Sequence, residues 1–248
     1  MIKLTGLSKK YGKTLVVDDA SAMFPKGEVT SIIGPNGAGK STLLSMASRL
    51  TDSDAGEVVI GDKLLAEWDT KELAKHLAVL RQSNNINMRF TIRELVCFGR
   101  FPHCQGRLKD EDHKVVDTAL EHLGITDIQN KYLDELSGGQ RQMAFIAMVV
   151  AQDTDYVFLD EPLNNLEIKH SVEIMQTLRR LAHEFNKAVV TVIHDINFAS
   201  CYSDNIVAMK NGKVVKSGKV SEVSHLRFVS SMVFESVCII QVVRVLVR

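Results

Sequence analysis

Residues 31–42, SIIGPNGAGKST, combine several glycines with a lysine and two hydroxyl side chains. The spacing Gly34-x-x-x-x-Gly39-Lys40-Ser41 is typical of a strand-to-helix phosphate-binding loop, although a glycine-rich turn that binds nothing would have a similar composition. Glycines let successive backbone N–H groups point at one anion, and the following helix adds the positive end of its dipole. Lys40 would then bind the β- and γ-phosphates of a nucleotide, and the hydroxyl of Ser41 would bind Mg²⁺. The expected nucleotide-binding residues are Gly34, Asn36, Gly37, Gly39, Lys40, Ser41 and Thr42.

Two adjacent carboxylates end the apolar run YVFLDE at residues 156–161. Ligands in α/β folds bind at the carboxyl ends of buried strands, so Asp160 is expected to hold Mg²⁺, in part through water. Glu161 is expected to polarise an attacking water, which requires an ionised carboxylate aimed at the γ-phosphate. The alternative for Glu161 is a helix cap or a local salt bridge.

A second anion site is predicted at LSGGQRQ, residues 136–142. Ser137, Gly138, Gly139 and Gln140 precede or open an apolar helical pattern, so their backbone N–H groups and the helix dipole favour an anion. Because the phosphate loop already provides one such site, this one implies a second contact.

These residues must be positioned by alternating strands and helices, which is the pattern of a parallel sheet covered by helices. Strands are expected at 28–34, 77–82, 156–161, 188–194 and 205–218, the last as a hairpin that turns at Asn211-Gly212. Helices are expected at 41–50, 108–124 and 138–152. The segment 84–155 contains helical patterns and almost no strand signal. We therefore expect a helical subdomain inserted into an α/β core.

Composition narrows the class of protein. The 30 basic and 30 acidic residues give a net charge of +0, so nothing global indicates a nucleic-acid partner. The four cysteines, at 97, 104, 201 and 238, lack metal-site or disulfide-framework spacing and favour a reducing cytoplasm. The N-terminal residues have no apolar signal core, and the longest apolar candidate, VCIIQVVRVLV near the C-terminus, is too short to span a membrane.

Taken in order, the motifs resemble those of ABC transporter ATPase subunits, over nearly the whole chain to about residue 222. The matching elements are Tyr11, the glycine-rich loop, Gln82, the signature Ser137-Gly138-Gly139-Gln140, Asp160-Glu161 and His194. The resemblance implies an α/β fold with a P-loop NTPase (RecA-like) core and parallel sheet, an N-terminal antiparallel β subdomain and an inserted helical signature subdomain. The core would comprise 1–83 and 156–223, the helical subdomain 84–155, and an atypical tail 224–248, all within one ABC ATPase domain.

The resemblance also assigns roles that the residues alone do not. Tyr11 would stack on adenine, and Gln82 would link Mg²⁺ and the attacking water to the helical subdomain. His194 would contact the γ-phosphate and position Glu161. Each has a simpler alternative, since an aromatic near a hairpin usually packs and a histidine that ends a strand is usually a core residue.

The implied cofactors are ATP and Mg²⁺, and the implied partners are a second copy and a membrane permease. In this family the signature of one subunit closes over ATP held by the other, in a head-to-tail dimer. No membrane span is found, so a separate permease is implied, with a periplasmic or surface substrate-binding protein acting indirectly. The subunit would lie peripherally on the cytoplasmic face of the cell membrane.

The stretch FTIRELVCFGRFPHCQGRL, residues 90–108, resembles the segment that follows the glutamine in importers of iron-siderophore complexes and vitamin B12. It is expected to face the permease as a groove for a short helix, formed by Phe98, Arg100, Phe101, Pro102 and His103. The alternative is a surface loop with Phe98 in the core. A ferric siderophore is the first expected cargo, followed by haem or cobalamin; a soluble ABC ATPase acting on ribosomes or DNA is the rival class.

Two departures from the family pattern stand out. Glu167 occupies the position where an Asp usually follows LDEP and helps to couple the two sites of the dimer. The Val-rich segment 224–248 does not resemble the usual end of this family. The sequence assigns neither feature a role.

Overall fold

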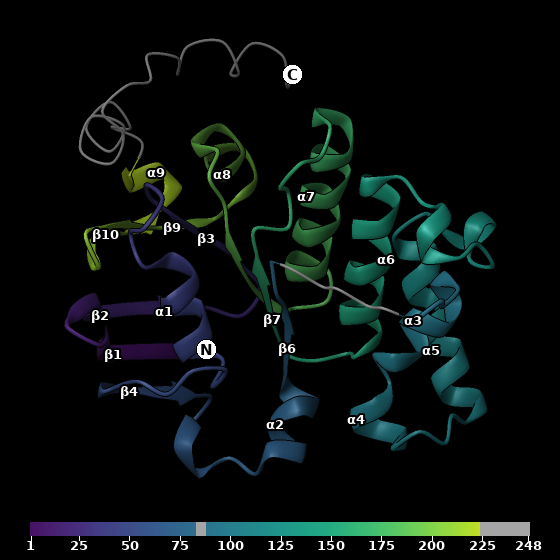
Figure 1. The fold of residues 1–248 in the computed structure, drawn as a ribbon, viewed down its shortest axis with the longest axis horizontal. Helices are drawn as coiled ribbons and strands as arrows, with labels where there is room; N and C mark the ends of the chain where they lie inside the picture. The colour runs from purple at the N-terminus through teal and green to yellow at the C-terminus, as the bar shows by residue number, and fades with distance from the viewer. Residues whose placement is uncertain (83–87, 224–248) are drawn as a thin grey trace.

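A computed structural model describes residues 1–82 and 88–223 of the 248-residue chain as an α/β fold with two sheets (Figure 1). Within these residues, an antiparallel sheet has the strand order β2-β1-β4-β5, and a larger sheet has the order β10-β9-β3-β8-β7-β6. The larger sheet is parallel from β9 to β6, and β10 pairs antiparallel with β9. The strands are β1 (Ile2–Tyr11), β2 (Thr14–Phe24), β3 (Val29–Ile33), β4 (Ala55–Ile60), β5 (Lys63–Leu64), β6 (Leu77–Leu80), β7 (Tyr156–Asp160), β8 (Ala188–Val192), β9 (Asn205–Lys210) and β10 (Lys213–Lys219).

The helices cover the sheets, and several of them lie between β6 and β7 in the chain. Local capping fixes several of their starts: Thr91 and Glu94 form a capping box at the third helix, and Asp69 accepts from two backbone N–H groups at the second. The helices are α1 (Lys40–Ala47), α2 (Thr70–His76), α3 (Ile92–Phe98), α4 (Phe101–Cys104), α5 (Asp110–His122), α6 (Gly138–Ala151), α7 (Ile168–His183), α8 (Ile196–Tyr202) and α9 (Val220–Val223). Short 3₁₀ turns occur at η1 (Leu65–Glu67), η2 (Thr126–Ile128) and η3 (Leu133–Glu135).

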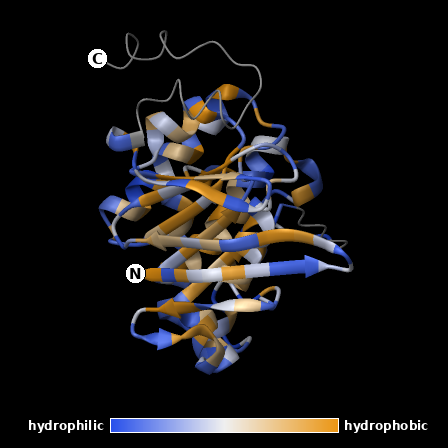
Figure 2. Cartoon of the chain, turned by 90° about the vertical axis from the view of Figure 1, so that its left-hand side faces the viewer, coloured by the Kyte–Doolittle hydropathy of each residue, from blue (hydrophilic) through white to orange (hydrophobic). Residues whose placement is uncertain are grey.

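Two large apolar clusters hold these elements together. One lies between the two sheets and includes Phe24 and Phe158, whose rings meet edge to face with centroids 5.9 Å apart. The other packs β6, β7 and α7 against α3, α5 and α6. Figure 2 shows the strands as largely hydrophobic bands with hydrophilic residues toward their ends and on the outer helices. The clusters meet along the central strands, so the larger sheet is buried on both faces.

The predicted fold class is confirmed, including the antiparallel β unit and the hairpin at Asn211-Gly212. The predicted strands 28–34, 77–82, 156–161 and 188–194 are too long, because β3 ends at Ile33, β6 at Leu80, β7 at Asp160 and β8 at Val192. Residues 88–155 contain α3 to α6, short 3₁₀ turns and one isolated bridge between Thr91 and Tyr132. The division into subdomains stays a prediction, and the tail 224–248 lies outside the described residues. Among the described residues, no helix is long and apolar enough to span a membrane.

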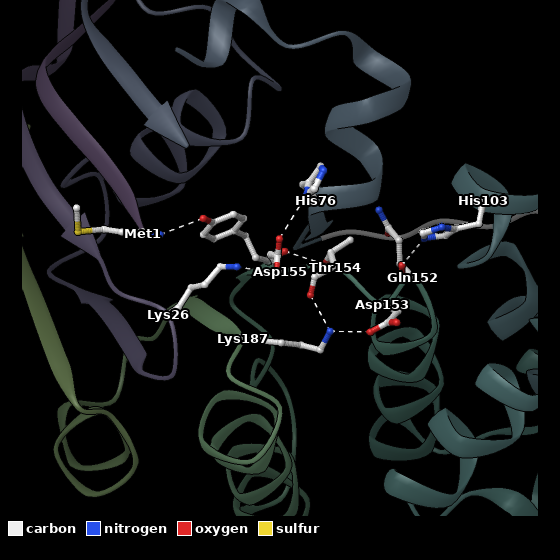
Figure 3. A network of polar contacts seen from close by, with 10 residues as sticks. Met1, Lys26, His76, His103, Gln152, Asp153, Thr154, Asp155 and Lys187 are labelled. Atoms are coloured by element: carbon white, nitrogen blue, oxygen red, sulfur yellow. Dashed lines mark hydrogen bonds and ion pairs between the residues drawn. The ribbon is translucent and has the colours of Figure 1, made fainter. Parts of the chain in front are cut away.

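A polar network joins the amino end of β7 to its neighbours (Figure 3). Asp155 accepts from Lys26 at 2.7 Å and contacts His76 at 3.2 Å. The side chain of Gln152 donates to two carbonyls at the end of α2 and the start of β6, and its own carbonyl accepts from His103 at 2.9 Å. The network therefore ties α2, α4 and the end of α6 to the sheet, on the edge opposite to Asp160.

Arg100 does not face a partner as the sequence predicted. It is 9 % exposed, donates to Asp112 at 2.9 Å and to the carbonyl of Ala151 at 2.9 Å, and thereby joins α3, α5 and α6. The Lys109 N–H and the Arg100 guanidinium hold the pKa of Asp112 below its ordinary value. A buried charge needs such partners, so Arg100 is a structural residue of the helical region.

We expect Arg100→Ala to lower the free energy of unfolding by about 3–5 kcal/mol, because it leaves Asp112 buried without its cation. Arg93→Ala is the control: the Arg93–Asp117 pair is 2.7 Å long but far more exposed, and its loss should cost about 1 kcal/mol or less. Urea unfolding measures both. Equal losses in the two variants would contradict the structural role of Arg100.

Candidate active site

The phosphate loop, residues 34–39, connects β3 to α1 at the carboxyl edge of the larger sheet. Gly39 precedes the helix with φ 93°, and no side chain caps the helix start. A Cβ on Gly39 would lie 2.6 Å from the carbonyl oxygen of Val16, so only glycine fits. The loop borders a cavity of about 900 Å³ lined by Val16, Gly34, Pro35, Asn36, Gly37, Ala38, Gly39, Lys40, Ser41, Thr42, Gln82, Glu161, Asn164, Asn165 and His194.

Lys40 is a buried cation at this loop. It is 5 % exposed, and its ammonium donates to the carbonyls of Gly34 at 2.9 Å and Pro35 at 3.0 Å. Burial lowers the pKa of Lys40, while the charges of Glu161 and Asp160 oppose that shift. The ammonium of Lys40 therefore places a positive charge at the cavity. A bound anion would replace the two loop carbonyls as the partner of this charge.

Asp160 and Ser41 meet across the sheet edge. The hydroxyl of Ser41 donates to Asp160 Oδ1 at 2.8 Å. Burial raises the pKa of Asp160 and the nearby Glu161 adds to the shift, while the Ser41 hydrogen bond opposes it. Ser41, Asp160 and the amide of Gln82 line one cavity and offer only oxygen ligands, which suit Mg²⁺. Within residues 1–82 and 88–223, no group of three His, Cys, Asp or Glu side chains is placed so that it could hold a metal ion.

Glu161 contacts groups from two other segments and from its own turn. Its backbone has φ 52°, a left-handed conformation that is costly for this residue type. Gln82 donates to Oε2 at 2.6 Å, His194 Nε2 lies 2.6 Å from Oε1, and Asn164 also donates to Oε2. These contacts hold the carboxylate, whose side chain is 9 % exposed, toward the phosphate loop. The sequence-predicted residues Gln82, Glu161 and His194 are thus brought together.

Asn164, Asn165 and Val16 line this cavity and were missed by the sequence prediction. Asn164 follows Glu161 by three residues in a turn where Asn165 has φ 59°, and it bonds the same carboxylate. The pair Asn164-Asn165 directly after LDEPL is a turn signal that could have identified it. Val16 lines the cavity from β2 and carries no comparable signal.

The signature residues lie away from the chain's own cavity. Ser137 and Gln140 form a capping box at the start of α6, with contacts of 3.3 and 3.2 Å. Ser137 and Gly138 are exposed, whereas Gly139 is buried against His170 of α7, whose ring lies 2.6 Å from where a Cβ would stand. None of the four lines the 900 Å³ cavity.

Tyr11 and Glu167 occupy peripheral positions. Tyr11 is 52 % exposed at the end of β1 and lines a separate cavity of about 210 Å³ that also touches Ser41, Thr42 and Gln82. The ammonium of Lys9 lies 5.8 Å from its ring centroid. Glu167 is exposed at the N-cap of α7 and makes no side-chain cap, a role for which the shorter Asp is better suited.

Comparisons with known proteins place this geometry in context. The family model described as ABC transporter matches residues 17–164. The petrobactin import ATP-binding protein YclP of Bacillus subtilis (strain 168) is 58 % identical over 222 residues, which are 90 % of this chain and 88 % of that protein. The iron(3+)-hydroxamate import ATP-binding protein FhuC of the same organism is 43 % identical over 215 residues, covering 86 % and 80 %.

Solved structures match as well. The dimeric structure of the bacterial ABC transporter cassette MJ0796 superposes with a TM-score of 0.79 at 31 % identity and covers 89 % of this chain and 99 % of that one. A second structure of the MJ0796 cassette, a dimer in a post-hydrolysis state bound to ADP and Pi, gives 0.78 at 31 % identity with the same coverage.

The raised pKa of Asp160 has a measurable consequence. A carboxyl whose folded pKa is raised costs stability when it is ionised, so Asp160→Asn should raise the melting temperature at pH 7 by about 2–4 °C without nucleotide. The difference should shrink as the pH falls through the raised folded pKa, and it should be gone below the ordinary Asp value of about 4, where the carboxyl is protonated in both the folded and the unfolded chain. Calorimetry across pH measures this, with the exposed Asp127→Asn as control. A lower melting temperature in the variant would show that ionised Asp160 stabilises the fold.

Proposed function

Because this chain belongs to the ABC transporter family, we propose that it is the ATP-hydrolysing subunit of an importer for ferric siderophores. The observation that carries the ATPase assignment is the meeting of buried Lys40, Ser41 and Glu161 around one large cavity, with Asp160 hydrogen-bonded to Ser41 beside it. The cargo is inferred from relatives whose names give petrobactin and iron(3+)-hydroxamate import.

ATP would bind with its phosphates in the loop, where backbone N–H groups and the start of α1 face the cavity. Lys40 would exchange its two carbonyl partners for phosphate oxygens. Ser41, Asp160 and Gln82 would hold Mg²⁺, which when bound supplies charge neutralisation of the phosphates. The burial of Lys40 strengthens its interaction with the phosphates, since little water competes for the ammonium.

Glu161 is the proposed base that orients and activates the attacking water. An ionised carboxylate has about four acceptor positions, and Gln82, Asn164 and His194 occupy three of them. One position is left for the water, so Glu161 need not lose its partners in order to act. Gln82 and His194 therefore serve as positioning groups that fix the direction of the carboxylate.

A second copy completes the site in this proposal. Ser137, Gly138, Gly139 and Gln140 do not line the chain's own cavity, yet they lie at the start of a 14-residue helix with its backbone N–H groups and dipole. The similar MJ0796 cassette is a dimer. We infer a head-to-tail pair in which each signature covers the nucleotide of the other copy, so that binding closes the dimer and hydrolysis reopens it.

The partner in the membrane is a separate permease, which the subunit meets peripherally from the cytoplasmic face. Met88, Phe98 and Phe101 are 65 %, 47 % and 59 % exposed, and the ring of Phe98 packs against Phe90 at 5.0 Å. Arg100 holds this helical region together from within, and the exposed aromatic side chains on its surface could bind the apolar face of a permease helix. A substrate-binding protein would act through the permease alone.

Replacing Glu161 with Gln tests the base and the dimer together. The amide keeps the volume but not the charge, so hydrolysis should fall at least about 100-fold while ATP binding survives. Light scattering during size exclusion should show a shift from monomer to dimer on adding ATP, and Ser137→Arg should abolish that shift. A variant that still hydrolyses ATP removes Glu161 from its role, and one that binds ATP but stays monomeric counts against the composite site.

Uptake of radiolabelled cargo tests the cargo assignment, with labelled iron for siderophores and haem and labelled cobalt for cobalamin. In Bacillus subtilis lacking YclP, expression of this chain should restore uptake of ferric petrobactin, and the Glu161→Gln variant should not. Ferric hydroxamate in a strain lacking FhuC, haem and cobalamin serve as the competing cargoes. Restored uptake of haem or cobalamin alone would replace the siderophore assignment and leave the ATPase intact.

A further inference from the structure

The turn Asn211-Gly212, which joins β9 and β10, lies against the back of the phosphate loop. The Gly212 N–H donates to the carbonyl of Ala38 at 3.2 Å. Ala38 is a loop residue that lines the 900 Å³ cavity, whereas Gly212 does not. The turn therefore contacts the loop from the side that ATP would not touch.

Strand β2 completes the same junction. The Asp18 N–H donates to the Gly212 carbonyl at 2.9 Å, and Lys213 pairs with the Asp18 side chain at 3.0 Å. The carbonyl oxygen of Val16 lies 2.7 Å from where a Cβ of Gly212 would stand, and 2.6 Å from where one of Gly39 would stand. The carbonyl oxygen of Val16 therefore leaves no room for a methyl group at Gly212 in the turn or at Gly39 in the loop.

The opening residue of the loop is held by the same hairpin. β9 pairs in parallel with β3, and a Cβ on Gly34 would lie 2.2 Å from the carbonyl oxygen of Met209. Gly34, at the start of the loop, therefore packs on the backbone of β9, and Gly39, at its end, packs on the backbone of β2. Backbone, unlike the end of a long side chain, cannot move aside cheaply.

We propose that Gly212 is a positioning residue for the phosphate loop, which it holds in its nucleotide-binding shape through Ala38 and the Val16 carbonyl. The proposal rests on the proposed ATP site. Coupling of this kind is reciprocal, so a turn that favours the binding shape must itself be stabilised when nucleotide binds.

Substitution by alanine with a matched control tests the idea. Gly212 and Gly61 both occupy hairpin turns with positive φ, 79° and 64°, but a Cβ on Gly61 meets no atom within 4 Å. Both glycines adopt a left-handed conformation, so both alanine variants carry backbone strain of a similar kind, and only Gly212→Ala is expected to displace the loop. We expect the ATP dissociation constant of Gly212→Ala to rise about tenfold, with kcat at saturating ATP changed less than about threefold, and Gly61→Ala to bind like the wild type.

Urea unfolding checks that both variants fold. If Gly212→Ala binds ATP as tightly as Gly61→Ala, the positioning role is excluded. If the wild type itself binds no ATP, the proposed function fails instead, so the two failures are distinguishable.

Hydrogen exchange on the wild type needs no substitution. A non-hydrolysable ATP analogue should slow exchange of the Gly212 and Asp18 amides at least severalfold, together with that of the phosphate-loop amides. Protection of the loop with no change at Gly212 and Asp18 would overturn the proposal, even if Gly212→Ala fails to fold.

Discussion

The burial of one ammonium group, that of Lys40, is the constraint around which the site is built. A cation that is 5 % exposed costs free energy unless dipoles and charges surround it, and here two loop carbonyls and the fields of Asp160 and Glu161 do so. The carboxylates must then be held as well, Asp160 by Ser41 and Glu161 by Gln82, His194 and Asn164. These groups come from different segments, and the parallel register of β3, β8, β7 and β6 brings their carboxyl ends to one edge.

In this arrangement the main polar groups of the site are paired within the chain itself. The Lys40 ammonium, the Ser41 hydroxyl and the Glu161 carboxylate each have protein partners, and the start of α6 is capped by its own Ser137 and Gln140. The raised pKa of Asp160 and the left-handed backbone of Glu161 each lower the stability of the fold, and both occur at residues of the site. A nucleotide that binds replaces the internal partners of groups whose positions are already fixed. Less conformational entropy is therefore lost on binding.

Local patterns in the sequence predicted the features whose causes are local. The phosphate loop, the existence of strand β7 and the hairpin at Asn211-Gly212 follow from backbone requirements within a few residues. Arg100 was misplaced because its partners, Asp112 and the carbonyl of Ala151, become neighbours only when three helices pack. Asn164 was missed because a turn signal does not say which carboxylate the side chain will reach. Strand ends at 34 and 82 were overextended because pairing, not propensity, ends a strand.

The position of β3 between β8 and β9 also has a consequence for biosynthesis. The phosphate loop and its flanking residues are complete in sequence at Thr42, but the neighbours that shape the loop include Met209 and Gly212. The interval from residue 42 to residue 212 is 170 residues (212 − 42), which at about 5–20 residues per second takes roughly 10–30 s to translate. Until synthesis reaches residue 188, β3 has neither of its strand neighbours, since β8 and β9 are both still to be made. The nascent chain therefore acquires its nucleotide-binding shape late, after the helical region has been synthesised, and long-range pairing of this kind makes folding slow.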